Sequence, residues 1–203
     1  MVNHHYYEEN QDQLESNPNI INFTFQNLSF KFHTDNGVFS KKYIDYGSLA
    51  LLKSLTIGNI EGEILDMGAG YGALGIIIAK LYSRQVLMCE INTRAVQLIK
   101  NNIAENKITN AKVYHSNLYD QIDKDKRFAY VVTNPPIRAG KQVVYGIYDG
   151  AFERLLPKGE LWVVIQKKQG APSSKEYLMG LFGNCEIINR DKGYYILKSV
   201  KNI

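Results

Sequence analysis

The folding pattern of this chain follows from one segment, Glu63-Ile64-Leu65-Asp66-Met67-Gly68-Ala69-Gly70-Tyr71-Gly72. Its first five residues are typical of a buried strand, and the apolar run 74–82 after the glycines predicts a helix. Glycines between a strand and a helix let the backbone turn sharply and approach a ligand closely. The segment therefore predicts the start of an α/β sheet with a nucleotide cofactor at its edge.

Strand and helix patterns alternate from this segment to the C-terminal end. Further strands are predicted over 85–91, 111–115, 128–133 and 160–166, with helices over 93–106, 143–156 and 173–182. The final strands, 185–189 and 194–199, are joined by the hairpin turn 190–193, so they must run antiparallel. This order predicts an α/β fold with a mostly parallel sheet, helices on both faces and an antiparallel last strand. In such sheets ligands bind beyond the carboxyl ends of the strands.

A hairpin and a helix precede the sheet. Residues 20–25 and 28–32 alternate apolar and polar side chains around Gln26-Asn27, which is the pattern of a β-hairpin. Asp35-Asn36-Gly37 predicts a turn, and a helix is predicted over 45–54.

Composition and charge indicate one globular domain. The chain has 203 residues, 45% hydrophobic and 22% charged, which suffices for one full core. We expect a flexible N-terminus over 1–19, with a solvated His4-His5 and no secretory signal, and a single domain over 20–203. No apolar run approaches the roughly 20 residues that span a bilayer. Because Cys89 and Cys185 lie in apolar strands, we expect reduced thiols and a cytoplasmic protein.

Two carboxylates stand at the ends of the first two strands. Glu90 ends the second strand, where it can accept both hydrogens of a ribose diol. Gly68, Gly70 and Ala73 also fit the G-x-G-x-x-G/A pattern of dinucleotide-binding enzymes, so an NAD enzyme is a competing interpretation. Asp66 separates the two, because a carboxylate there opposes a pyrophosphate at the helix N-terminus. It suits S-adenosylmethionine, which has no phosphate and carries a sulfonium and an ammonium.

A second motif, Asn134-Pro135-Pro136-Ile137, follows the fourth strand. Each proline removes a backbone donor, and Pro135 disfavours helical geometry at Asn134, so the loop is stiff and extended. The side-chain oxygen of Asn134 and the carbonyl of Pro135 can then point the same way, which suits a substrate NH2 group. A strand-ending turn is the structural alternative. Asn117, after the third strand, fits a turn or a helix N-cap.

With these motifs the chain resembles class I S-adenosylmethionine-dependent methyltransferases. More narrowly, it is similar to the small-subunit ribosomal RNA guanine-N2 methyltransferases of the RsmC type, in a short single-domain form. The resemblance covers roughly residues 20–200. It rests on Gly37-Val38-Phe39-Ser40, Asp45-Tyr46-Gly47-Ser48, Asn134-Pro135-Pro136 and Gln166-Lys167-Lys168-Gln169-Gly170-Ala171. It implies a Rossmann-like seven-stranded class I methyltransferase sheet, with the N-terminal hairpin as an extension.

The resemblance also assigns residues to the site. It implies that the loop 37–40 closes over the site and that Asn134 and Pro135 are catalytic. Cofactor binding is expected from Asp66, Gly68, Ala69, Gly70, Glu90, Ile91, Asn117, Leu118 and Asn134. Substrate binding is expected from Phe39, Pro136, Ile137, Arg138, Lys141, Lys167 and Lys168.

Two positions depart from the family pattern. Ile137 stands where many relatives carry an aromatic residue that stacks on the target base, and Arg138 stands where many carry His. We expect Phe39 or a tyrosine to supply the stack, which is worth about 1–3 kcal/mol per base. Longer relatives have an additional N-terminal domain, so RNA recognition here would rely on one domain or on a second copy.

The expected reaction is in-line methyl transfer from the sulfonium to an exocyclic amine, with N2 of a guanine in small-subunit ribosomal RNA as the favoured acceptor. Adenine N6 or a protein glutamine would use the same pair of acceptors. A non-catalytic RNA-binding or assembly factor is the alternative from another class. No metal is expected, since no His, Cys and Asp cluster has metal-ligand spacing.

Basic residues suggest the partner. The net charge of +4 permits a nucleic acid. Side chains that follow strands four and five can flank one mouth and contact RNA phosphates, namely Arg138, Lys141, Lys167, Lys168 and Lys175. A solvated face is the alternative. The expected partner is ribosomal RNA or the small-subunit particle, with no membrane involved and the chain a monomer or a homodimer.

Overall fold

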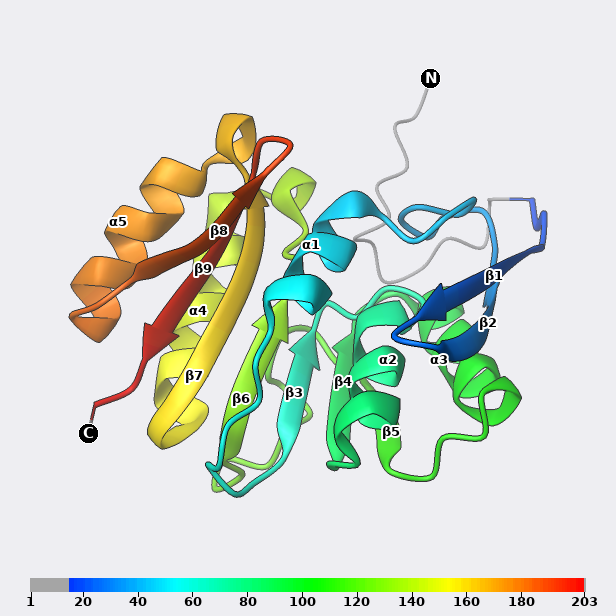
Figure 1. The fold of residues 1–203 in the computed structure, drawn as a ribbon, viewed down its shortest axis with the longest axis horizontal. Helices are drawn as coiled ribbons and strands as arrows, with labels where there is room; N and C mark the ends of the chain where they lie inside the picture. The colour runs from blue at the N-terminus through cyan, green and yellow to red at the C-terminus, as the bar shows by residue number, and fades with distance from the viewer. Residues whose placement is uncertain (1–14, 203) are drawn as a thin grey trace.

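The computed structural model describes residues 15–202, which form a two-stranded and a seven-stranded sheet (Figure 1). The larger sheet has the order β5-β4-β3-β6-β7-β9-β8. Its strands are β3 (Ile64–Met67), β4 (Val86–Glu90), β5 (Ala111–His115), β6 (Phe128–Thr133), β7 (Leu155–Gln166), β8 (Glu186–Asp191) and β9 (Tyr194–Val200). Strands β3 to β7 pair parallel, and β9 pairs antiparallel with both β7 and β8. The predicted sheet is confirmed, including its reversed last strand.

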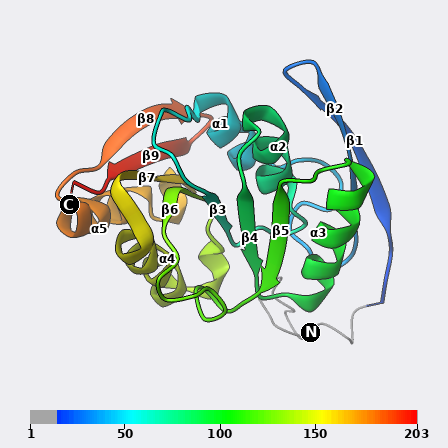
Figure 2. The same cartoon turned by 90° about the horizontal axis from the view of Figure 1, so that it is seen from below.

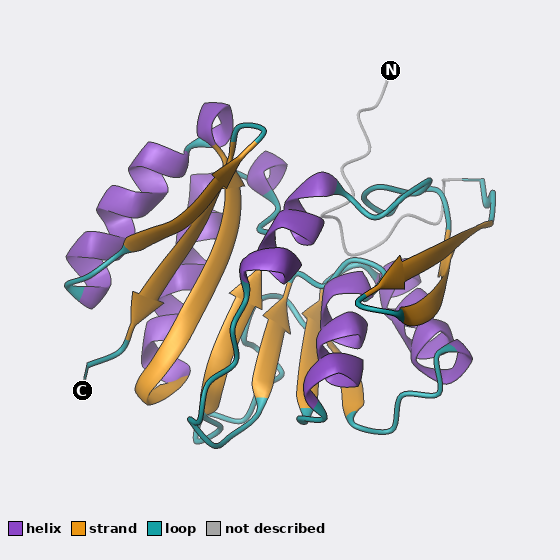
Figure 3. Ribbon diagram, in the orientation of Figure 1, coloured by secondary structure: helices purple, strands orange, loops and turns teal. Residues whose placement is uncertain are grey.

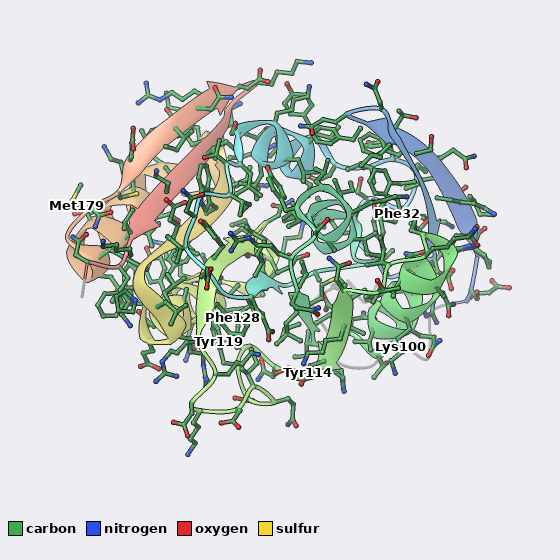
Figure 4. All side chains as sticks on the ribbon, turned by 60° about the horizontal axis from the view of Figure 1, so that its bottom comes forward. Phe32, Lys100, Tyr114, Tyr119, Phe128 and Met179 are labelled. Carbon is green, nitrogen blue, oxygen red and sulfur yellow. The ribbon has the colours of Figure 1, made fainter. Side chains whose placement is uncertain are left out.

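Helices cover both faces of this sheet (Figures 2 and 3). One face carries α1 (Tyr46–Ser54), α2 (Ala73–Tyr82) and α3 (Thr93–Glu105), and the other carries α4 (Lys141–Arg154) and α5 (Ala171–Phe182). Side chains alternate between the two faces along each strand. In β6, Val132 packs on the α1 and α2 side, whereas Val131 packs on the α4 and α5 side. Figure 4 shows Phe128 and Tyr119 on the α4 side.

The N-terminal hairpin consists of β1 (Asn19–Phe25) and β2 (Leu28–Thr34), and it packs outside α3 (Figure 2). Its turn residues Gln26 and Asn27 have φ of 47° and 64°, as the tight predicted turn requires. Asn102 of α3 accepts from the backbone N–H of His33 and donates to its carbonyl, at 2.7 and 3.0 Å. The same amide donates to the carbonyl of Tyr71 at 2.9 Å, so the hairpin is tied to the glycine loop.

The predicted boundaries between α4 and β7 and between β8 and β9 are wrong. Helix α4 ends at Arg154, and β7 begins directly at Leu155, five residues earlier than expected. Leu155 pairs with Phe128 in the sheet and is buried, so the helix ends where this strand pairing begins. The pairing shifts register between Phe128 and Tyr130. Between β8 and β9 the turn is only 192–193, because residues 190 and 191 still pair with β9.

Part of the expected flexible N-terminus lies on the domain. The hydroxyl of Ser16 donates to Asp35 at 2.8 Å, and the backbone N–H of Asn17 donates to the same carboxylate at 2.6 Å. His4-His5 lies outside the described residues. Within 15–202, no helix has the length and apolar character needed to cross a bilayer. The same residues contain no group of His, Cys, Asp and Glu side chains that could hold a metal ion.

Candidate active site

A cavity of about 420 Å³ opens at the carboxyl ends of the central strands. Its walls come from the loops after β3 and β6, the end of β4, the loop 37–40 and the first turn of α1. This is the edge where parallel α/β sheets bind ligands. The structure therefore brings together the glycine loop and the Asn-Pro-Pro motif, which are 66 residues apart when counted from Gly68 to Asn134 (134 − 68).

The glycine loop leaves room for a ligand. Gly68 and Gly70 have φ of 75° and 58°, which side chains rarely adopt. A Cβ on Gly68 would meet Pro136 no closer than 3.7 Å, and one on Gly70 would have no described atom within 4 Å. Gly72 differs, because a Cβ there would lie 3.1 Å from Ile99. The first two glycines thus leave the cavity open, whereas the third allows α2 and α3 to pack.

Glu90 organises the loops around the cavity. Its Oε2 accepts the backbone N–H of Gly70 at 2.8 Å, and its Oε1 accepts those of Ile91 and Asn92 at 2.9 Å each. The residue is 6% exposed, and burial raises the pKa of the carboxyl while the three backbone N–H groups oppose the rise. A carboxylate with two oxygens has acceptor capacity beyond these three bonds. One acceptor site remains on Oε2, so Glu90 can accept from one hydroxyl of a diol at the cavity wall.

Asp66 has a structural contact as well as a place in the cavity wall. Its Oδ2 accepts the backbone N–H of Gly75, the third residue of α2, at 2.8 Å. The N-cap of that helix, Gly72, has no side chain to do this. Burial, with a smaller contribution from the charge of Glu90, raises the pKa of Asp66 to about 7. A bound cation would favour its charged form.

The amide of Asn134 is held by the first turn of α1. Its Nδ2 donates to Asp45 Oδ1 and to Ser48 Oγ, both at 3.1 Å. A carboxylate only accepts hydrogen bonds, so the nitrogen of the amide must face Asp45. Pro135 and Pro136 are buried beside it, and a short 3-10 turn (Ile137–Ala139) follows. The strand end is therefore held by buried prolines and by hydrogen bonds of Asn134 to the start of α1.

Several residues that the sequence did not single out for a role also line this cavity. They are Asp45, Ser48, Tyr71, Leu74, Gln166, Gln169 and Tyr194. Gln166 ends β7, so the rule about carboxyl ends of strands could have identified it. Tyr194 begins the antiparallel β9 opposite Gln166, and the start of a reversed strand lies at the same edge. Asp45 and Ser48 belong to the segment 45–48, which resembles the methyltransferase family, but no role was predicted for them.

The predicted site residues fall into three groups. The cavity is lined by Phe39, Asp66, Gly68, Ala69, Gly70, Glu90, Asn134, Pro135, Pro136, Ile137 and Arg138. Ile91 and Leu118 line a small adjoining pocket behind Gly68 and Glu90, and Asn117 lies in the turn beside it. The lysines do not line the cavity: Lys167 and Lys168 are exposed in a 3-10 turn (Lys167–Gln169), and Lys141 begins α4.

Comparisons with known proteins agree with this geometry. Residues 29–198 match the family model of the methyltransferase small domain. The uncharacterised protein YbxB of Bacillus subtilis is 45% identical over 98% of this chain and 100% of its own length. Ribosomal RNA small subunit methyltransferase C of Vibrio parahaemolyticus is 30% identical over 82% of this chain and 48% of its length.

A solved structure adds a ligand-bound neighbour. The 16S rRNA N2 methyltransferase RsmC of Thermus thermophilus, in complex with AdoMet (S-adenosylmethionine) and guanosine, superposes with a TM-score of 0.83 at 26% identity. The match covers 91% of this chain and 50% of that one. The chain thus spans about half the length of these methyltransferases and the whole length of the Bacillus relative.

Proposed function

The chain belongs to the methyltransferase small domain family, whose cofactor is S-adenosylmethionine, and from this premise we propose that it methylates N2 of a guanine in small-subunit ribosomal RNA. The observation that carries the proposal is the orientation of Asn134. Its nitrogen is bound to α1, so its oxygen is left to accept from an amine, in the cavity that also contains the open glycine loop.

The cofactor would lie against the glycine loop. Gly68 and Gly70 let the backbone approach it, and the carboxylate of Glu90 would accept from a hydroxyl of its ribose. Asp66 would face its cationic part, and Ile91 with Leu118 would flank its adenine end. When bound, this cofactor supplies an electrophilic methyl group on a sulfonium.

The amine would lie against the Asn-Pro-Pro loop. We propose that the side-chain oxygen of Asn134 and the carbonyl of Pro135 accept its two hydrogens. The lone pair of the nitrogen, otherwise delocalised into the guanine ring, would then face the methyl group. The N–C bond would form as the C–S bond of the sulfonium breaks, the cofactor would leave as a neutral thioether, and the methylated amine would lose one proton to solvent. Positive charge that develops on the nitrogen would be stabilised by the same two dipoles, which are fixed before the reaction. Holding both reactants in line lowers the barrier further.

The mouth of the cavity fits a base and its phosphates. Phe39 is 43% exposed at the rim, and Tyr194 lies in the wall, so either ring can supply the stack that Ile137 cannot. The amides of Gln166 and Gln169 can hydrogen-bond the edge of a base.

The exposed Lys167 and Lys168 follow Gln166 directly, where they can reach phosphates. The base must leave its stack to enter such a site. Action on ribosomal RNA would place the protein in the cytoplasm.

Transfer of a labelled methyl group tests the proposal. The protein and a cofactor that carries a tritiated methyl group are incubated in separate reactions with total RNA, small ribosomal subunits, DNA or protein extract. The labelled fraction is then digested and its modified units are identified. We expect N2-methylguanosine from RNA. Label in N6-methyladenine or methylglutamine would overturn the proposed acceptor, and cofactor binding without transfer to any fraction would indicate a non-catalytic binding factor.

A further inference from the structure

Helix α1 reaches the amide of Asn134 through its first turn, and we propose that Asp45 and Ser48 are positioning residues that set the direction of this amide. The inference rests on the proposed function, because the direction matters only if Asn134 accepts hydrogen bonds from an amine. Among residues 15–202, the only hydrogen bonds that join these two residues to the Asn-Pro-Pro motif are those from the Asn134 amide. Within this range they form none with the glycine loop 68–72.

The Nδ2 of the Asn134 amide donates to two side chains at the start of α1. Asp45 Oδ1 and Ser48 Oγ each accept from it, both at 3.1 Å. An NH2 group has two hydrogens in the amide plane, so two acceptors define both the tilt and the direction of that plane. The oxygen then occupies the remaining corner, away from α1.

The opposite orientation of the amide is disfavoured by charge. Turning the amide by half a turn would place its oxygen against the carboxylate of Asp45, and both groups only accept. The terminal torsion of an asparagine is otherwise broad, so the chain beyond Cβ does not choose an orientation. In the wrong orientation, N–H donors would meet the N–H donors of the substrate amine. Asp45 therefore selects the orientation in which transfer can occur.

Asp45 is itself fixed by its second task. It is the N-cap of α1, and the same Oδ1 accepts the backbone N–H of Ser48 at 3.1 Å. Its negative charge at a helix N-terminus is stabilised by the helix dipole. A carboxylate that accepts from the amide nitrogen also polarises the amide, which makes its oxygen a stronger acceptor. One carboxylate thus starts the helix and orients the amide.

Helix α1 cannot move away from Asn134 without losing packing. A Cβ on Gly47 would lie 2.9 Å from the ring of Tyr194, so that ring rests directly on the first turn. The hydroxyl of Tyr46 donates to Asp191 at the end of β8. Leu51 is fully buried in the core below. These contacts hold the first turn between Asn134 on one side and the β8–β9 hairpin on the other.

Three substitutions and a control test the positioning role in methyl transfer. Asp45→Ser keeps an N-cap residue, but its hydroxyl is too short to reach Asn134. Ser48→Ala removes the second acceptor. Asp45→Asn keeps an oxygen for both bonds and is the conservative variant. Ser54→Ala removes a hydroxyl at the far end of the same helix, where it donates to the Ala50 carbonyl and accepts from the exposed Asn189 side chain at 3.2 Å.

We expect kcat to fall about 10- to 100-fold in Asp45→Ser and Ser48→Ala, because a small misplacement of a reacting group costs this much. The Kd for the cofactor should stay within twofold of wild type in both. Asp45→Asn should recover most of kcat, and Ser54→Ala should match wild type. A wild-type kcat in Asp45→Ser and Ser48→Ala would overturn the positioning role. So would equal losses in kcat and cofactor affinity, which indicate a general loss of structure.

A measurement without RNA separates this inference from the proposed function. In ¹⁵N spectra, the two amide hydrogens of Asn134 are assigned by their disappearance in Asn134→Ala. We expect slow exchange with water in wild type and fast exchange in Asp45→Ser. Fast exchange in wild type would overturn the inference. If wild type shows slow exchange but methylates no RNA amine, the proposed function fails while the orientation of the amide stands.

Discussion

The two halves of the cavity are built in different ways. The glycine-loop half consists of residues 66–72 and Glu90, and its hydrogen bonds run mainly between carboxylates and backbone N–H groups. The Asn134 half consists of Asn134, Asp45, Ser48 and Tyr194, and it is held by side chains. There Asn134 bonds to residues 86 and 89 positions away in the chain.

This difference separates the residues that we expect to bind the cofactor from those that we expect to act in methyl transfer. Backbone groups next to strand ends form a binding surface whose shape depends on φ angles and glycines. Side chains brought together from distant segments form a directional acceptor, whose geometry depends on packing of α1 and the β8–β9 hairpin. We therefore expect substitutions in the glycine-loop half to change cofactor affinity, and substitutions in the Asn134 half to change the rate of transfer.

Asn134→Ala gives the sharpest test of this separation. It removes one of the two proposed acceptors, and we expect kcat to fall by about 100- to 1,000-fold, as for loss of one fixed dipole in an active site. Tritiated-methyl transfer under single-turnover conditions measures the rate, and calorimetry measures the cofactor Kd. The exposed Asn101→Ala is the control. Near-normal transfer by Asn134→Ala would remove the residue from the mechanism.

Glu90→Ala tests the other half. The carboxylate would lose its ribose contacts, and hydrogen bonds to a charged group are worth about 1.5–3 kcal/mol, so we expect the cofactor Kd to rise about 10- to 100-fold. At saturating cofactor, kcat should change little. Titration calorimetry measures the Kd, with the exposed Asp120→Ala as the matched acid. An unchanged Kd in Glu90→Ala would exclude it from the cofactor site.

Gly47→Ala asks whether the packing of α1 supports the Asn134 half. The new Cβ would lie 2.9 Å from the Tyr194 ring and 3.0 Å from Asp45 Oδ1, and overpacking of this kind typically costs about 1–3 kcal/mol. Urea unfolding measures this loss, and kcat should fall with it while cofactor Kd is kept. Gly180→Ala in α5 is the control, because no described atom lies within 4 Å of its Cβ. It should be neutral or stabilising by up to about 1 kcal/mol. Equal stability of the two variants would argue against tight packing at Tyr194.

A further test concerns pH and the glycine-loop half. The pKa of Asp66 is raised from 3.8 to about 7. Between these two pH values, the folded state keeps a proton on Asp66 that the unfolded chain has lost. Without cofactor, the free energy of unfolding should therefore fall as pH rises from about 4 to about 7. A cationic cofactor favours ionised Asp66, so its affinity should rise over the same interval and its binding should release protons below pH 7.

Calorimetry in buffers of different ionisation enthalpy counts these protons. In Asp66→Asn the release should decrease. The same proton release in Asp66→Asn and in wild type would show that Asp66 does not titrate on binding.

Much of the fold was predictable because its signals are local. Alternating strand and helix patterns, the glycine loop after β3 and the tight turn before β9 each depend on neighbouring residues. The position of Glu90 and Asn134 at one edge follows from parallel strands alone. The end of α4 was not predictable in this way, because Leu155 leaves the helix to pair with Phe128, a contact between separate segments.

The candidate site shows the same division. The amino-acid sequence was enough to indicate the sheet, the cofactor loop, the carboxylates and the rigid Asn-Pro-Pro strand end, because these follow from backbone preferences over a few residues. It could not indicate which way the Asn134 amide points, nor that Asp45, Ser48 and Tyr194 share its cavity. Those features depend on how α1 and a reversed strand pack against β6. Such packing is set by the buried surfaces of segments far apart in the chain, and no local pattern encodes it.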